Sequence, residues 1–338
     1  MDDKIKLGLI GAGAVAQITH IPIWQKLDEV ELVAVCDTQK NKAKWVAEKY
    51  NIPNVFDDGD DFLKLEEMHA VDVCTPTQSH MQNVMAALSS DRHVIVEKPM
   101  ALNYSESKTM VEAAQKYEKM LMVAMNVRFR QDAIILKSFT KNNELGEIFY
   151  CKAGWLQKKE KYIQRNWFAQ KEISGGGVIM DLGIQMLDVG LWLMGNPRAE
   201  NVKAATFNQS AKLNVEDAAV AFIGLQNGAT LTVEVSWTLL SDKDLFYANF
   251  FGTGGGALLN PLRIHKELHG NLVNVSPSRS ESRANLYKKS YENEMKHFIT
   301  CIREKSVLSS SGAENLDRMR IVDAIYESAR SGREVILK

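Results

Sequence analysis

The sequence predicts an α/β domain with a doubly wound parallel sheet, followed by an α+β domain with a large, mostly antiparallel sheet that leaves one face open. Up to residue 125, short apolar runs alternate with stretches of helical periodicity, which is typical of βαβ units. From Asn126 onward, several segments alternate apolar and polar residues with period two, which is typical of half-exposed antiparallel strands. We therefore expect one domain over residues 1–125 and a second over residues 126–338.

Each element of the first domain is predicted from its local pattern. Continuous apolar runs indicate buried strands, and apolar residues spaced three and four apart indicate helices. The expected strands cover residues 5–10, 31–36, 71–74, 93–96 and 121–125. The expected helices cover residues 14–26, 40–50, 79–89 and 104–117.

The second domain is predicted to contain fewer helices and more strands. Asn227-Gly228 separates two alternating segments and is typical of a tight hairpin turn. The expected strands cover residues 147–155, 218–225, 230–237 and 245–251, and the expected helices cover residues 178–194, 291–303 and 313–330.

Composition excludes several classes of function. The 41 basic and 42 acidic side chains leave a net charge of -1, whereas nucleic-acid binders normally carry a basic excess. No apolar run approaches the roughly 18–20 residues that span a bilayer, and the N-terminus lacks the apolar stretch of a signal peptide. The four cysteines are scattered without metal-ligand spacing. We therefore expect a cytoplasmic protein with no nucleic-acid or membrane partner and no metal site.

A glycine motif predicts a dinucleotide site. The segment from Gly11 to Ala16 fits GxGxxG/A directly after a strand and at the start of a helix. Gly11 allows a tight turn, Gly13 allows the backbone to approach a pyrophosphate, and Ala16 allows close packing of helix and strand. Asp37 follows about 20 residues later, where a carboxylate accepts from ribose hydroxyls. Its charge disfavours a 2′-phosphate and so favours NAD, while three nearby lysines leave NADP open.

Two further segments complete a recognisable pattern: Glu97-Lys98-Pro99 after the strand 93–96, and the glycine-rich run from Ser174 to Gln185. Together with the glycine motif they resemble the glucose–fructose oxidoreductase / inositol dehydrogenase / MocA (Gfo/Idh/MocA) family over nearly the whole chain. The resemblance implies a Rossmann domain and NAD(P)-dependent oxidation or reduction at a carbinol of a sugar, cyclitol or related polyol. It also implies a homodimer or homotetramer formed through the C-terminal sheet.

The resemblance also assigns site residues. The family's lysine falls on Lys98 and its downstream aspartate on Asp181, but its catalytic histidine falls on Gln185, which cannot titrate. We expect Lys98 to act as the acid/base, with Asp181 and Gln185 positioning the substrate. The expected cofactor-binding residues are Gly11, Ala12, Gly13, Val15, Ala16, Asp37, Thr75, Pro76, His80, Glu97, Lys98 and Asn126, and the expected substrate-binding residues are Lys98, Arg128, Trp167, Asp181 and Gln185.

Gln185 leaves three hypotheses open. The first is an active dehydrogenase in which Lys98 carries proton transfer. The second is an enzyme that uses tightly held NAD in a transient oxidation to eliminate a glycoside, and the third is a non-catalytic dinucleotide-binding protein. Asp181, Gln185 and Asp188 are expected to share a helix face by their spacing, and the basic, aromatic segment 158–165 is a candidate for binding an anionic sugar.

Overall fold

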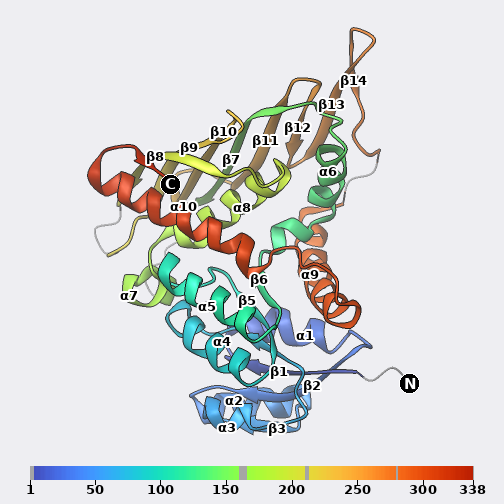
Figure 1. Ribbon diagram of the computed structural model, residues 1–338, viewed down its shortest axis with the longest axis vertical. Helices are drawn as coiled ribbons and strands as arrows, with labels where there is room; N and C mark the ends of the chain where they lie inside the picture. Colours follow the sequence, from blue (N-terminus) through green and yellow to red (C-terminus); the bar gives the residue numbers. More distant parts are fainter. Residues whose placement is uncertain (1–3, 160–165, 210–212, 279–280, 338) are drawn as a thin grey trace. The chain divides into compact units, whose positions relative to one another are not determined.

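The computed structural model describes residues 4–159, 166–209, 213–278 and 281–337. The chain divides into two compact units. The N-terminal unit comprises Met1–Met125 and Tyr291–Leu316, and the C-terminal unit comprises Asn126–Ser290 and Asp317–Lys338. Each unit has its own sheet and its own buried core, and Figure 1 labels their elements.

The N-terminal unit is built on a six-stranded parallel sheet in the order β3-β2-β1-β4-β5-β6. The chain builds outward from β1 in one direction and then returns to build from β4 in the other. Such a reversal leaves a crevice at the carboxyl ends of the two central strands, where dinucleotides bind. The strands are β1 (Ile5–Ile10), β2 (Val30–Cys36), β3 (Asn54–Phe56), β4 (Ala70–Val73), β5 (His93–Glu97) and β6 (Leu121–Ala124).

Helices connect these strands, as the sequence predicts. The first helix is divided, because its initial turns have π-helical hydrogen bonding before the α-helix resumes. The sequence analysis does not anticipate β3 or α3, since both are too short to show a period. The helical segments are η1 (Ala16–His20), α1 (Ile21–Trp24), α2 (Lys40–Tyr50), α3 (Gly59–Leu63), η2 (Thr77–Ser79), α4 (His80–Ser89) and α5 (Tyr104–Lys116).

The two compact units differ from the predicted domain division in one segment. The sequence analysis assigned all of residues 126–338 to the second domain, but Tyr291–Leu316 belongs to the N-terminal unit. Ser310 explains the placement, because its backbone carbonyl accepts from the Val123 N–H at 3.0 Å and its hydroxyl donates to the Val123 carbonyl at 2.7 Å. These bonds attach the returning chain to the outermost strand β6. This segment contains parts of α9 (Arg283–Glu304) and α10 (Gly312–Ser331).

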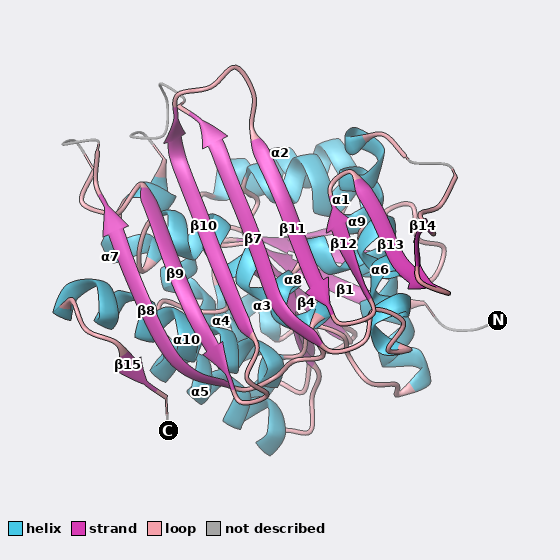
Figure 2. Cartoon of the chain, turned by 90° about the horizontal axis from the view of Figure 1, so that it is seen from above, coloured by secondary structure: helices cyan, strands magenta, loops and turns pink. Residues whose placement is uncertain are grey.

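The C-terminal unit carries a nine-stranded sheet in the order β14-β13-β12-β11-β7-β10-β9-β8-β15. All of its strand pairs are antiparallel except β7 with β10, so the sheet is mixed rather than purely antiparallel. Figure 2 shows the long central strands side by side. The strands are β7 (Ile148–Lys158), β8 (Ala199–Phe207), β9 (Ala218–Leu225), β10 (Thr230–Leu239), β11 (Leu245–Gly252), β12 (Gly255–Leu259), β13 (Leu262–Leu268), β14 (Asn271–Asn274) and β15 (Val335–Ile336).

The two faces of this sheet differ. On β9, Ala219, Ala221 and Ile223 are buried, whereas Phe222 between them is 56% exposed. The buried face packs against helices of the same unit, and Figure 2 shows α8 behind the strands. The open face displays further large apolar side chains, among them Phe251 on β11 and Leu258 on β12. The remaining helical segments of the unit are η3 (Asn126–Phe129), α6 (Gln131–Lys141), η5 (Trp167–Ala169), α7 (Lys171–Ser174), η6 (Ile179–Gly183) and α8 (Ile184–Leu193).

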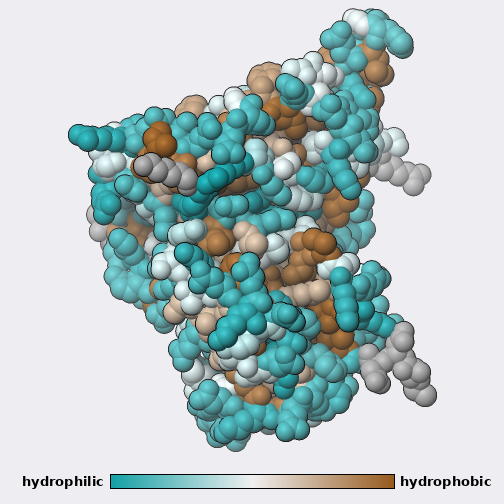
Figure 3. Space-filling model, in the orientation of Figure 1, coloured by the Kyte–Doolittle hydropathy of each residue, from teal (hydrophilic) through white to brown (hydrophobic). Residues whose placement is uncertain are grey.

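The helical stretch Lys171–Leu193 is long and apolar enough to cross a membrane by length and composition, which the sequence analysis did not anticipate. Of its most apolar window, 89% is buried inside the protein, as expected for a core helix of a globular unit. Figure 3 shows hydrophobic side chains in small separate groups among hydrophilic ones on the face in view. The apolarity of this helix is therefore explained by its burial within the fold.

Candidate active site

The glycine motif forms the turn after β1 that the sequence predicts. Gly11 has a φ of +97°, and a Cβ there would lie 2.7 Å from the backbone of Cys74, so no other residue fits without strain. Around Gly13, the nearest atom to an added Cβ is the Cys74 carbonyl oxygen, at 4.0 Å. Ala16 is fully buried at the start of η1. The loop therefore has an open surface at Gly13, above the first helical turn, and this surface fits a pyrophosphate.

Asp37 follows β2 and is tied to this loop. One carboxylate oxygen accepts from the Ala12 N–H at 2.9 Å, and the other accepts from the Gln39 N–H at 2.9 Å. Lys42, from α2, forms an ion pair with Asp37 at 2.7 Å. Asp37 thus follows the strand after which the Rossmann fold binds the adenosine ribose. Lys42 is one of the three lysines because of which the sequence analysis left NADP open as a cofactor.

The loops after β4 and β5 are joined by His80. Its Nε2 lies 2.8 Å from the carbonyl oxygen of Thr75, and its Nδ1 lies 2.9 Å from that of Pro99. Burial lowers the pKa of this imidazole, while the two carbonyl partners act in the opposite direction. His80 therefore anchors both Thr75-Pro76 and the backbone beside Lys98, in agreement with a place at the carboxyl edge of the sheet. The Lys98 side chain itself is half-buried.

Four residues that the sequence analysis did not name as site residues form a buried polar cluster with Glu97 beneath this edge. The imidazole of His20 lies between the carboxylates of Asp72 and Glu97, at 2.8 and 2.9 Å. Trp24 Nε1 donates to Asp72 at 2.7 Å, and the thiol of Cys74 lies 3.4 Å from the same carboxylate. A sequence signal existed, because Asp72 interrupts an otherwise apolar buried strand, where an ionised side chain needs a partner.

Ligand atoms of His20, Asp72 and Cys74 lie within 4.8 Å of one another, a spacing that also suits a metal ion. The chemistry of the three groups does not favour one. Burial raises the pKa of the Cys74 thiol well above its usual value, so sulfur is not the thiolate that metals prefer. Both ring nitrogens of His20 already hydrogen-bond to carboxylates. We therefore assign this group as a hydrogen-bonded cluster.

In the C-terminal unit, Glu216 organises the glycine run. One of its carboxylate oxygens accepts from the Gly177 N–H, the Ile179 N–H and the Tyr326 hydroxyl, at 2.9, 3.0 and 2.8 Å. Burial raises the pKa of Glu216, and these hydrogen bonds lower it. A Cβ on Gly177 would lie 2.0 Å from the Glu216 carbonyl oxygen. Glu216, which sequence analysis did not name as a site residue, thus fixes the start of the helix that carries Asp181.

Asp181 lies in the π-helical segment η6 and accepts from Trp237 Nε1 at 3.1 Å. Gln185, one turn later in α8, donates its side-chain amide to the Asp181 backbone carbonyl at 3.0 Å. Phe168 packs against Trp237 with ring centroids 5.5 Å apart. The structure therefore brings Asp181 and Gln185 together, as their spacing predicts, beside an aromatic group. A π-turn of this kind is frequent at functional sites.

The expected substrate role of Arg128 does not agree with its position. Its side chain is 0% exposed and donates from Nε to Asp188 at 2.7 Å, while Arg318 donates to the other oxygen of Asp188 at 3.1 Å. Burial alone would raise the pKa of Asp188, but the two arginines hold it below its usual value. Arg128, Asp188 and Arg318 form an ion-pair network in the core. A buried arginine needs a carboxylate partner, and Asp188 is that partner for both arginines.

The other expected residues are placed as follows. Asn126 is 5% exposed in η3 and donates to the Ser290 hydroxyl at 3.0 Å. Trp167 is 39% exposed and neighbours Phe168, with ring centroids 6.2 Å apart. Of the basic segment 158–165, residues 160–165 lie outside the described residues.

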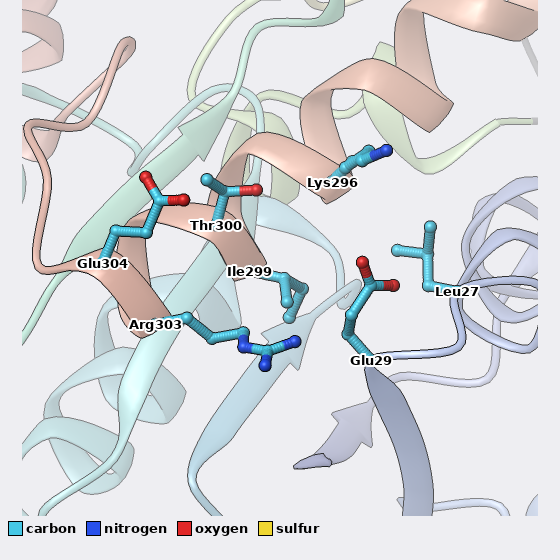
Figure 4. A pocket seen from close by; sticks show the side chains of 7 residues that line it. All are labelled: Leu27, Glu29, Lys296, Ile299, Thr300, Arg303 and Glu304. Atoms are coloured by element: carbon cyan, nitrogen blue, oxygen red, sulfur yellow. The ribbon is translucent and has the colours of Figure 1, made fainter. Parts of the chain in front are cut away.

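A separate hollow of about 560 Å³ lies elsewhere on the N-terminal unit. Figure 4 shows Leu27 and Glu29 on one side of it and side chains of α9 on the other. Glu29 immediately precedes β2, so this hollow lies at the amino end of that strand. The glycine loop follows the carboxyl end of the neighbouring strand β1, and the hollow is therefore distinct from the candidate site.

Comparisons with known proteins agree with this geometry. Residues 5–125 match the family model described as an oxidoreductase family with an NAD-binding Rossmann fold, and residues 137–337 match that of its C-terminal alpha/beta domain. The chain belongs to the Gfo/Idh/MocA oxidoreductase family. The expected family, the Rossmann domain and the mostly antiparallel second sheet are confirmed.

Members of this family resemble the chain over nearly its full length. D-glucoside 3-dehydrogenase of Escherichia coli (strain K12) is 30% identical over 98% of this chain and 97% of its own. D-apiose dehydrogenase of Paraburkholderia graminis is 25% identical over 99% and 90%. An oxidoreductase from Agrobacterium radiobacter, solved in complex with NAD+, L-tartaric acid and magnesium, superposes with a TM-score of 0.88 at 26% identity over 98% of both chains. The protein is therefore an oxidoreductase of an NAD-binding family, and its relatives include proteins named as sugar dehydrogenases.

Proposed function

We propose that the protein is an NAD-dependent dehydrogenase that oxidises a secondary hydroxyl of a sugar, cyclitol or related polyol, or reduces the corresponding ketone. One observation carries the proposal. The strand order places the ends of β1, β4 and β5 side by side, and these ends bear the glycine loop, Thr75-Pro76 and Lys98. When bound, NAD accepts or donates the hydride. The open backbone at Gly13 and the Asp37 carboxylate fit its pyrophosphate and ribose.

Lys98 is assigned the proton transfer. Removal of hydride from the carbinol carbon leaves a protonated, positively charged carbonyl group unless a base takes the hydroxyl proton. In the reverse reaction an acid must supply that proton. Gln185 has no titratable group, and its amide suits the task of orienting a hydroxyl or carbonyl of the substrate. Asp181, oriented by Trp237, is a second acceptor for a substrate hydroxyl. Asn126 and Trp167 remain candidates for contacts with nicotinamide and substrate.

The substitution Lys98→Met tests this assignment. We expect hydride transfer to fall by about 10²–10⁴-fold while NADH binding, followed by fluorescence, persists. Lys98→Arg is the matched control, because arginine keeps the positive charge but cannot deprotonate. Unchanged turnover in Lys98→Met, measured with a panel of D-glucosides, D-apiose and inositols, would disprove the role of Lys98.

Two alternatives are separated by simple measurements. Release of aryl alcohol from aryl glycosides without net change in nicotinamide absorbance would indicate redox-assisted elimination. NADH binding without turnover of any polyol, in both the wild type and Gln185→His, would indicate a binding protein. Robust dehydrogenase activity in the same panel excludes the binding protein and leaves the proposed function.

Three further properties belong to this proposal. We propose NAD rather than NADP as the preferred cofactor, because Asp37 opposes a 2′-phosphate. The large apolar side chains on the open sheet face favour a homodimer or homotetramer formed through that face. The four cysteines are all free and buried, which favours a reducing, cytoplasmic location.

A further inference from the structure

His20 is a buried side chain that links three elements of the N-terminal unit. It ends η1, the helical segment that follows the glycine loop, and it is 0% exposed. Its Nδ1 lies 2.8 Å from Oδ2 of Asp72 on β4, and its Nε2 lies 2.9 Å from Oε1 of Glu97 at the end of β5. The imidazole therefore connects the helix of the dinucleotide loop to the two strands that lead to Thr75 and Lys98.

The other partners of these two carboxylates are donors as well. Trp24 Nε1 donates to Oδ2 of Asp72 at 2.7 Å, and the Cys74 thiol donates to Oδ1 at 3.4 Å. The Lys98 N–H donates to Oε2 of Glu97 at 3.0 Å. Each of the four carboxylate oxygens thus has at least one hydrogen-bond partner that can donate to it.

This arrangement determines the protonation of His20. A neutral imidazole has a single N–H, and here both ring nitrogens face carboxylate oxygens, which favour the form with two N–H donors more strongly than the neutral carbonyls that face His80. Burial by itself disfavours a charged ring, but the charge and hydrogen bond of Asp72, together with those of Cys74, whose sulfur lies 3.3 Å from Nδ1, raise the pKa of His20 well above 6.5. His20 is therefore an imidazolium at neutral pH, between two carboxylates.

The backbone on both sides of Lys98 is held by a buried histidine. Before it, Glu97 bonds to His20 through one oxygen and to the Lys98 N–H through the other. After it, the Pro99 carbonyl bonds to His80. The two histidines differ, because the partners of His80 are neutral carbonyls and those of His20 are charged. Replacing the imidazolium by a neutral side chain would leave both buried carboxylates without this partner, and we expect Glu97 to move as a result.

We propose that His20 is a positioning residue for Lys98: as a buried imidazolium it fixes the Glu97 carboxylate, which in turn fixes the backbone from which the Lys98 side chain extends. Its catalytic consequence rests on the proposed function, in which Lys98 transfers the proton. The link itself depends only on contacts within the N-terminal unit.

The link is tested in the full-length protein without any substrate. In ¹⁵N NMR spectra, wild-type His20 is expected to show two slowly exchanging ring N–H signals at pH 7, and both disappear in His20→Gln. In the same variant, hydrogen exchange of the Lys98 amide is expected to accelerate by about tenfold or more. Trp24→Phe is the matched control, because it removes a donor to Asp72 without touching Glu97, and Lys98 exchange should stay within about twofold of wild type.

Glu97→Gln is a second variant that does not leave excess negative charge. His20 and the Lys98 N–H bond to different oxygens of Glu97, and glutamine has an NH₂ group in place of one of them, so the variant loses one of the two bonds and should also accelerate exchange at Lys98. With NAD as the hydride acceptor, His20→Gln should lower kcat for the best sugar of the panel by about 10- to 100-fold with little change in KM for NAD. When Glu97 is already replaced by Gln, adding His20→Gln should lower kcat by less than about twofold, because His20 acts on Lys98 by way of the Glu97 carboxylate.

The outcomes are distinguishable. A single ring N–H for His20, unchanged Lys98 exchange in both variants, or additive losses of kcat would each overturn the positioning role. If wild type turns over no sugar, or Lys98→Met leaves turnover unchanged, the proposed function fails, and the ring signals with amide exchange still decide whether His20 positions Lys98.

Discussion

At the scale of single residues, the charges around Asp37 are the basis of the proposed preference for NAD. Asp37 accepts from the Ala12 N–H of the glycine loop, and we propose that the same carboxylate binds a ribose hydroxyl of NAD. Lys42 is paired with that carboxylate in the structure. The sequence showed that lysines are near Asp37 but not which one reaches it. A single pairing distance therefore turns an ambiguous charge pattern into a specific experiment on cofactor choice.

The substitution Asp37→Ser tests that choice. Removing the carboxylate removes the repulsion of a 2′-phosphate and frees Lys42 to pair with it. We expect the ratio of the Kd for NADPH to that for NADH to fall by about tenfold or more, equivalent to about 1.4 kcal/mol. Fluorescence titration measures both constants. The double variant Asp37→Ser/Lys42→Met is the control, and it should lose most of the gain if Lys42 is the cation responsible.

At the scale of elements, the glycine run is explained by close packing around Glu216. A Cβ at Gly177 would meet the Glu216 carbonyl oxygen at 2.0 Å, while one at Gly59 in α3 would have no neighbour within 4 Å. Gly177→Ala is therefore expected to destabilise the protein by about 1–3 kcal/mol, because backbone must move. Gly59→Ala is expected to be neutral or stabilising by up to about 1 kcal/mol. Urea denaturation gives the free energy of unfolding of each variant, and equal values for the two would contradict the packing argument.

The ion-pair network of α8 predicts a pH dependence. Asp188 has its pKa lowered in the folded protein by Arg128 and Arg318, so its contribution to stability is present above the unfolded value near 3.8 and is lost as pH falls through the lower folded value. Asp188→Asn leaves two buried arginines without their counter-charge and should cost about 3–5 kcal/mol at pH 7.

The free energies of unfolding of wild type and Asp188→Asn, measured in urea between pH 7 and pH 3, check this expectation. Their difference should be constant above about pH 5 and should shrink below about pH 4. A difference that grows toward low pH would have the wrong sign and would remove Asp188 as the ionised member of the network.

At the scale of the whole molecule, the proposed oligomer is a property of the open sheet face. Phe222 is 56% exposed on β9, and Phe251 and Leu258 are exposed on neighbouring parts of the same face. Phe222→Lys should shift the protein to the mass of one chain in light scattering while leaving NADH binding intact, because a buried unpaired charge opposes association. Val307→Lys, at a 91% exposed position in the N-terminal unit, is the control and should leave the mass unchanged.

Much of the fold and part of the site follow from local sequence. Apolar runs and helical periods predict the five longer strands of the parallel sheet and most of its helices, because each pattern is contained within one element. The short β3 and α3 escape prediction, since three to five residues show no period. The return of Tyr291–Leu316 to the N-terminal unit also escapes it, because that placement depends on hydrogen bonds to Val123 across more than half of the chain.

The sequence by itself predicted the dinucleotide loop and the acidic residue after β2, because each depends on residue type at a fixed spacing. Lys98, Asp181 and Gln185 were predicted from the resemblance of their segments to the Gfo/Idh/MocA family. Tertiary structure alone decided which charges meet. In the folded chain Arg128 pairs with Asp188, where the sequence analysis expected a substrate contact, and Lys42 pairs with Asp37. His20 lies between Asp72 and Glu97. The physical reason is that a side chain's protonation and role depend on its burial and partners, and folding brings those partners together from distant parts of the chain.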